Sequence, residues 1–137
     1  MLTWKGEIVL DKTMRAAGRA VNSVLADCVT TAKADAPVKT SAYQGSIQMR
    51  QAFVGSGGEI IGQFGSFAIN YAMAIERGTR AHVIVSTGPW SLHNKQTGQY
   101  FGRIVNHPGT RGRFVLTRAM ERHGPSLPLR IQMEMGA

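Results

Sequence analysis

The chain has 137 residues, of which 43% are hydrophobic, so it can form one core of ordinary size and is too short for two. Its single cysteine, Cys28, excludes an intramolecular disulfide, and without a second cysteine at a metal-ligand spacing we expect no zinc site. The formal net charge of +8 favours acidic partners, either nucleic acid or an acidic protein surface.

The positive charge is concentrated in the second half of the chain. From Glu76 onward, nine basic residues stand against three acidic ones. The basic residues are Arg77, Arg80, Lys95, Arg103, Arg111, Arg113, Arg118, Arg122 and Arg130. No apolar run reaches the length of a signal peptide or of a membrane span, which needs ~20 residues, so we expect a soluble protein made in a reducing cytoplasm, without a membrane partner.

Apolar residues recur at steps of four and three from Leu10 onward, and this spacing predicts one long amphipathic helix from Leu10 to Ala36. Asp11 is the expected N-cap, and Pro37 ends the helix because its ring disfavours helical geometry at the preceding residue. The predicted buried stripe consists of Leu10, Met14, Ala17, Val21, Val24, Cys28 and Ala32. On this stripe Cys28 is expected to be a small buried hydrophobe rather than a reactive thiol.

Residues Tyr43 to Val54 alternate between apolar and polar side chains, which predicts a half-buried strand. Its expected buried side chains are Tyr43, Ile47, Met49 and Phe53. Residues 55–58 (Gly-Ser-Gly-Gly) then reverse the chain, and Glu59 to Phe67 returns as the second strand of an antiparallel hairpin. Gly62 and Gly65 mark either a bulge or a place where another backbone comes close.

A short helix is predicted from Tyr71 to Arg77, with Asn70 as its N-cap and Gly78 in the C-terminal capping position. Tyr71, Ala72 and Ile75 form its expected buried face. The following 79–112 segment has expected strands at 83–85 and 99–105. A long segment without a core of its own is usually functional, and we interpret it as a projecting β-arm that orders against a neighbour.

Helical spacing returns from Phe114 to His123, where Phe114, Val115, Ala119 and Met120 are expected to face inward. Gly124 and Pro125 end this helix. Alternation of Leu129, Ile131, Met133 and Met135 then favours a final strand from Leu127 to Met135, with a short helix as the alternative.

The expected fold class is therefore α+β, with a long N-terminal helix, a small mostly antiparallel sheet, two shorter helices and a long projecting β-arm. We expect a single domain over residues 1–137, in which residues 79–112 form the arm or loop.

Residues that could carry chemistry are sparse. His82, His93, His107 and His123 lack the spacing that places two imidazoles on one metal ion, and the eight acidic residues offer no obvious catalytic pair. No nucleophile elbow, phosphate-binding loop or dinucleotide fingerprint is present. Glu76 with His107 is the one candidate pair for a small hydrolase. We therefore expect a protein that is not an enzyme and that needs no metal or cofactor.

Four segments in order resemble a known family. They are Ala36-Pro37-Val38-Lys39-Thr40, then Gly45-Ser46-Ile47, then Tyr71-Ala72-Met73-Ala74-Ile75-Glu76-Arg77-Gly78-Thr79, and finally Val105-Asn106-His107-Pro108-Gly109-Thr110 leading to Phe114. Together they are similar to the small minor tail and neck proteins of long-tailed bacteriophages. The resemblance covers about residues 10–123, and Thr40-Ser41 stands where the family has Thr-Gly.

This resemblance implies a virion protein of the neck or the top of the tail, present in the host cytoplasm during assembly. It implies a tail terminator or tail completion subunit of a closed homo-oligomeric ring, a hexamer. Its partners would be other copies of itself, the tail tube protein, a head-side connector or stopper protein, and genomic DNA passing through the channel. A ring needs heterologous interfaces, which a projecting arm can supply.

Two groups of residues are the candidates for these contacts. The expected subunit-interface residues are Tyr71, Glu76, Gly78, Thr79, Trp90, His107, Pro108, Gly109 and Phe114. The expected residues facing the DNA channel or an acidic partner are Arg80, Arg103, Arg111, Arg113 and Arg118. A small basic DNA-binding protein is the alternative that the charge favours.

Overall fold

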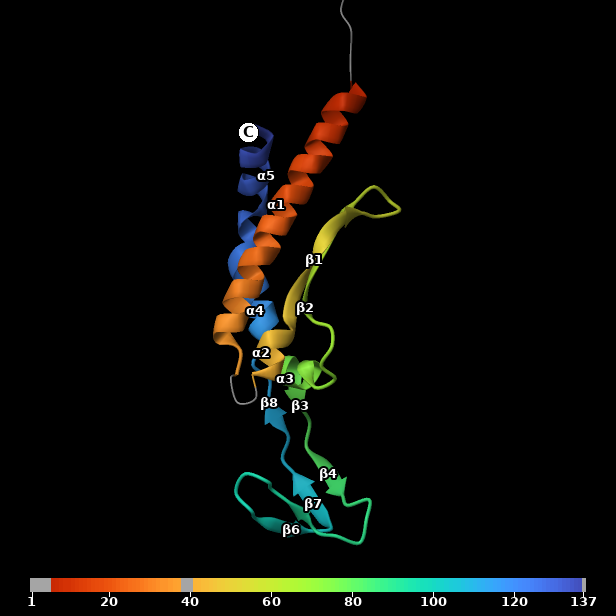
Figure 1. Cartoon of the computed structure of the whole chain (residues 1–137), viewed down its shortest axis with the longest axis vertical. Coiled ribbons are helices and arrows are strands. Elements are labelled where there is room, and N and C mark those ends of the chain that lie inside the picture. Colours follow the sequence, from red (N-terminus) through yellow and green to blue (C-terminus); the bar gives the residue numbers. More distant parts are fainter. Residues whose placement is uncertain (1–5, 38–40, 137) are drawn as a thin grey trace, which may run out of the picture. The chain divides into compact units, whose positions relative to one another are not determined.

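The computed structural model describes residues 6–37 and 41–136 and confirms the α+β fold class (Figure 1). The chain divides into two compact units. One contains the residues before Met73 together with those from Phe114 onward, and the other is Met73–Arg113. The second unit is close in extent to the expected arm of residues 79–112, and the single domain expected for the whole chain stays a prediction.

The first unit is built on a long helix, α1 (Gly6–Asp35), which confirms the helix predicted from Leu10 to Ala36. Because α1 already begins at Gly6, the prediction of Asp11 as its N-cap was wrong. Asp11 lies inside the helix and pairs instead with Arg15 one turn later, at 3.1 Å between Oδ2 and Nε.

The buried stripe of α1 differs from the predicted one in its first half. Small side chains are buried at steps of four, namely Ala16, Ala20, Val24, Cys28 and Ala32, whereas Leu10 is 64% exposed. This stripe packs against α4 (Val115–His123), whose buried residues are Val115 and Ala119. The thiol of Cys28 donates to the carbonyl of Ala119 at 3.6 Å, so its expected burial is confirmed. The small side chains of this stripe let the two helices approach closely.

A second face of α1 packs against a hairpin formed by β1 (Ile47–Val54) and β2 (Ile60–Ser66). At Gly62 an added Cβ would lie 2.6 Å from Cδ1 of Leu25 and 2.7 Å from Cγ1 of Val21. Gly62 therefore marks a close approach of α1 to the hairpin and not a bulge.

The start of the first strand was predicted too early. Tyr43, which is 1% exposed, lies in a short helix, α2 (Ala42–Ser46), and β1 begins only at Ile47. The register with β2 shifts between Arg50 and Phe53, and this bulge breaks the predicted alternation, so Phe53 is 54% exposed. The amide of Ala52, within the bulge, donates to Oδ1 of Asn22 on α1 at 2.8 Å.

Two of the four residues predicted to face inward in the helix from Phe114 to His123 do not do so. Phe114 precedes α4 with a left-handed φ of 49° and is 47% exposed, and Met120 is 42% exposed. Gly124 and Pro125 belong to a 3₁₀ turn, η1 (Gly124–Ser126), which leads directly into a further helix, α5 (Leu127–Gly136).

The strand favoured over Leu127 to Met135 was thus wrong, and the helical alternative holds. Alternate apolar residues suggested a strand, but Leu129 and Met133 are 60% and 67% exposed. Arg130 and Glu134, four residues apart, face α1 instead. Arg130 pairs with Asp27 at 2.5 Å, and Glu134 pairs with Arg19 at 2.7 Å. Packing and ion pairs with α1 therefore decide the conformation.

The second unit consists of nested antiparallel ladders. After α3 (Ala72–Arg77), β3 (Gly78–Thr79) pairs with β8 (Thr110–Arg111), β4 (His82–Val85) pairs with β7 (Ile104–His107), and β5 (Leu92–His93) pairs with β6 (Tyr100–Gly102). The strand expected at 99–105 is divided between β6 and β7, because Gly102 turns the chain with a φ of 82°. Tyr71 was expected in the buried face of α3, but it is 40% exposed, and the buried residue of α3 is Glu76.

Candidate functional site

The base of the Met73–Arg113 unit is closed by the β3–β8 ladder. The hydroxyls of Thr79 and Thr110 lie 3.0 Å apart, and the amide of Arg113 donates to the carbonyl of Ile75 at 2.9 Å. Gly78 has a φ of 77°, and a Cβ there would collide with the carbonyl oxygen of Thr110. The two strands of the base can therefore lie this close only with glycine at this position.

A turn at residues 107–109 closes the next ladder. The amide of Gly109 donates to Nδ1 of His107 at 3.0 Å, which holds the turn together. Gly109 has a φ of 87°, and a Cβ there would lie 2.8 Å from the carbonyl carbon of Arg80 and 2.9 Å from the amide nitrogen of Ala81. The turn that the sequence suggested at His107, Pro108 and Gly109 is present, and it packs backbone against backbone.

The β4–β7 ladder places apolar side chains on both of its faces. Paired residues of an antiparallel ladder share a face, so Ile84 lies beside its partner Val105 on one face. On the other face Val83, Val85 and Ile104 are 57%, 59% and 67% exposed. This second face, Val83–Val85–Ile104, is called the aliphatic face below. Strands in which successive residues are apolar, and so both faces are apolar, are typical of sheets covered on both sides.

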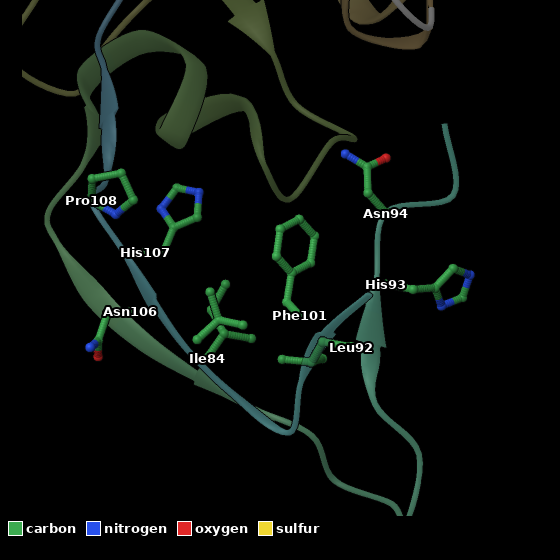
Figure 2. A pocket seen from close by; sticks show the side chains of 9 residues that line it. Ile84, Leu92, His93, Asn94, Phe101, Asn106, His107 and Pro108 are labelled. Carbon is green, nitrogen blue, oxygen red and sulfur yellow. The ribbon is translucent and has the colours of Figure 1, made fainter. Parts of the chain in front are cut away.

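A pocket of about 610 Å³ lies on the Ile84 face of the ladder (Figure 2). Its apolar lining consists of Ile84, Leu92, Phe101, Val105 and Pro108, and its polar lining of His93, Asn94, Asn106 and His107. In Figure 2 the rings of Phe101 and His107 stand on the same side of the ribbon with open space between them, while His93 and Asn106 point away. The pocket thus has apolar walls and an imidazole at its edge.

The hydrogen bonds of His107 fix its tautomer. Since Nδ1 accepts the Gly109 amide, the proton of the neutral ring is on Nε2. The ring also stacks on His82 with centroids 4.9 Å apart, and Nδ1 of His82 donates to the carbonyl of Arg80 at 2.7 Å. His107 therefore offers one N–H donor while its other nitrogen is engaged in the turn.

Positive charge dominates the surface of the Met73–Arg113 unit. Its six basic residues are Arg77, Arg80, Lys95, Arg103, Arg111 and Arg113, and all of them are exposed. Its one acidic residue, Glu76, is 9% exposed. Exposed basic side chains therefore outnumber acidic ones on this unit, which gives it a positive charge.

The suggested pair of Glu76 and His107 does not form a pocket site. Glu76 is buried in α3, and it is not among the residues that line the pocket beside His107. His107 has its ring stack and its turn hydrogen bond instead. That the chain is not an enzyme stays a prediction.

The expected interface residues are distributed over both units. Gly78, Thr79, His107, Pro108 and Gly109 form the base and turn of the Met73–Arg113 unit, where Trp90 is 79% exposed. Tyr71 and Phe114 belong to the other unit and are about half exposed. Of the four resembling segments, residues 38–40 (Val-Lys-Thr) lie outside the described residues.

The expected DNA-facing residues also fall into two groups. Arg80, Arg103, Arg111 and Arg113 are on the Met73–Arg113 unit, whereas Arg118 lies on α4 of the other unit. Its Nε donates to the carbonyl of Phe114 at 3.3 Å. The first four are all exposed on this unit, and their orientation toward a channel stays a prediction.

Sequence reasoning missed the pocket. Its walls come from β4, β5, β6 and β7, and no spacing in the sequence showed that Ile84, Leu92 and Phe101 would meet. The one available signal for the pocket was the run His82 to Val85, where successive apolar residues indicate a strand with two apolar faces.

No family model, curated protein or solved structure matches this chain. Over residues 6–37 and 41–136, no helix has the length and apolar character needed to cross a membrane. In the same residues no cluster of three or more histidine, cysteine, aspartate or glutamate side chains is placed to hold a metal ion.

Proposed function

We propose that this chain is a structural, non-enzymatic virion protein of a long-tailed phage, a ring-forming neck or tail terminator subunit that joins the tail tube to the head connector. The resemblance of the four ordered segments motivates the proposal. The observation that carries it is the presence of two different uncovered apolar surfaces on one chain.

The first of these surfaces is the aliphatic face of the β4–β7 ladder, where Val83, Val85 and Ile104 are more than half exposed. The second is on α5, where Leu129 and Met133, one turn apart, are 60% and 67% exposed. Exposed apolar side chains gathered on one element mark interaction sites. A closed ring requires two unlike surfaces on each subunit, and the two exposed apolar surfaces are our candidates for them.

The proposal is tested by the mass of the full chain in solution, measured by native mass spectrometry over a range of concentrations, and by detection of the chain in purified particles. We expect a defined oligomer of more than two copies and a fixed copy number per particle. A chain that is monomeric at all concentrations and absent from particles would contradict the proposal.

A matched pair of variants locates the interface. Val83→Glu combined with Ile104→Glu places charge on the aliphatic face and should weaken assembly more than ~10-fold without changing the circular dichroism spectrum. Thr97→Glu combined with Gln99→Glu adds the same charge at exposed polar positions and should leave assembly intact. Equal assembly of both variants would show that the aliphatic face is not an interface.

The cationic surface of the Met73–Arg113 unit favours the second candidate, a small DNA-binding protein. Its test is the binding of duplex DNA by the full chain as a function of salt. Affinity that falls steeply with salt would support it, because neutralised phosphates release counterions. Undetectable binding at low salt would remove it.

A further inference from the structure

The pocket on the Ile84 face has the walls of a site for an apolar group. Ile84, Leu92, Val105 and Pro108 supply aliphatic surface, Phe101 supplies a ring, and the volume is about 610 Å³. Pockets of ~300–1,000 Å³ with mostly apolar lining and a few polar groups are the usual form of ligand sites. The occupant must therefore bring at least one large apolar side chain.

The edge of the pocket offers a hydrogen-bond donor, so an occupant should supply an acceptor there. His107 is held by the Gly109 amide at Nδ1, so Nε2–H is its remaining donor. Asn94, at the other end of the pocket in Figure 2, adds an amide group. A peptide carbonyl or a carboxylate next to the apolar side chain satisfies the imidazole donor.

Charge then specifies the rest of the occupant. Lys95 follows the pocket residue Asn94, and Arg103 lies between the pocket residues Phe101 and Val105. Both cations are exposed, and they belong to a unit whose one acidic side chain is buried. A partner that carries carboxylates around its apolar side chain is therefore electrostatically complementary to this surface.

A second copy of the chain is a poor occupant. It carries a formal net charge of +8, and three of its acidic residues are already engaged in ion pairs within their own subunit. These are Asp11 with Arg15, Asp27 with Arg130 and Glu134 with Arg19. A second copy therefore offers few carboxylates that could meet Lys95 and Arg103 around the pocket.

Nucleic acid would meet the same cations, but the pocket walls favour protein. Single-stranded nucleic acid binds by stacking its bases on aromatic rings, and four of the five apolar wall residues are aliphatic or proline. The exposed ring of Tyr100 already stacks on His93, with centroids 5.3 Å apart. Aliphatic walls instead suit the side chain of leucine or phenylalanine.

We propose that this pocket binds an acidic segment of another protein, which inserts a leucine or phenylalanine between Phe101 and His107 while its carboxylates meet Lys95 and Arg103. This goes beyond the proposed function, because it concerns the face of the ladder opposite the aliphatic face. It holds for a monomer as well as for a ring subunit, so it succeeds or fails independently of ring formation.

The test uses the full chain and fluorescein-labelled peptides of about ten residues, with binding followed by fluorescence anisotropy. The probe is a peptide of aspartate and glutamate with a central Leu-Phe pair. Its matched control has the same charge and Ser-Ser in place of Leu-Phe. We expect the probe to bind at least ~10-fold more tightly than the control, because burying a large apolar side chain contributes this much. Equal binding of the two peptides would overturn the proposal.

Variants of the protein place the binding at the pocket. The double variant Lys95→Glu with Arg103→Glu should lower the affinity for the probe ~10-fold, and Phe101→Ala should lower it ~5-fold. Val83→Ser, on the opposite face of the ladder, should leave the affinity for the probe within ~2-fold of that of the unaltered chain. Because the two peptides are compared on the unaltered protein, that comparison tests the proposal even if Phe101→Ala disturbs folding.

A duplex of about twenty base pairs serves as the nucleic-acid arm of the same experiment. We expect it to bind less tightly than the probe, and its affinity should be unaffected by Phe101→Ala. Tighter binding of the duplex than of the probe, together with an effect of Phe101→Ala on the duplex alone, would overturn the proposal in favour of nucleic acid.

Discussion

Replacement of Gly109 by alanine tests how the turn at residues 107–109 holds the β4–β7 ladder closed. Two separate costs apply at this position. The φ of 87° lies in the left-handed region, where an L residue costs ~1–2 kcal/mol. The new Cβ would also lie within 3 Å of backbone atoms of Arg80 and Ala81, which cannot yield as a side-chain end would. Overpacking of this kind adds ~1–3 kcal/mol.

Gly98→Ala is the matched control. Gly98 has a φ of 72°, yet nothing lies within 4 Å of its Cβ position, so only the backbone cost applies. We expect Gly98→Ala to destabilise the unit by about 1 kcal/mol and Gly109→Ala by about 3 kcal/mol. The difference isolates the contact between the two backbone segments.

The assay is amide hydrogen exchange measured by NMR over β4 and β7, together with urea unfolding of each variant. Exchange in these strands should accelerate by about two powers of ten in Gly109→Ala relative to the unaltered chain, since 1.4 kcal/mol is a factor of ten. Exchange in α1 should change less, because α1 belongs to the other unit. Equal destabilisation by the two alanine variants would refute the reasoning.

Three further predictions concern the other unit. Burial and the nearby carboxylate of Asp27 raise the pKa of the Cys28 thiol above its ordinary value of 9.0. A thiol reagent at pH 8 should therefore react slowly with the native chain and fast with the denatured chain. The contribution of this thiol to the stability of the fold should fall as the pH rises through 9. Fast labelling of the native chain would contradict this. Arg130→Ala removes three side-chain partners and should lower the free energy of unfolding by about 1 kcal/mol in urea titrations, against almost none for the exposed Arg122→Ala. Ala20→Leu should cost about 2 kcal/mol or more in the same titrations, because Ala20 is fully buried between helices, and a cost below 0.5 kcal/mol would be inconsistent with that packing.

Local patterns predicted the elements whose own residues carry a clear apolar pattern. The long helix, the return strand predicted from Glu59 to Phe67 and the strand predicted at Val83 to Val85 are all present, as α1, β2 and β4. Gly78 was predicted as a helix-ending residue, and its φ of 77° agrees. The expectation failed at Leu127 to Met135, where alternation suggested a strand and ion pairs with α1 stabilise a helix.

The interaction surfaces depended on contacts between distant segments. The sequence showed the charge excess of the second half and the turn at His107 to Gly109, and both are local properties. It did not show the bulge after Arg50, which exposes Phe53, because register is set between strands.

The sequence by itself determined the α+β class, the long amphipathic helix, the hairpin turn and the cationic character of residues 73–113. Each of these follows from composition or from spacing along one element. Only the tertiary structure decided that Ile84, Leu92 and Phe101 meet around one pocket and that Val83, Val85 and Ile104 share an uncovered face. The physical reason is that strand pairing joins residues about twenty positions apart, and the energy of that pairing resides in the contacts and not in either segment alone.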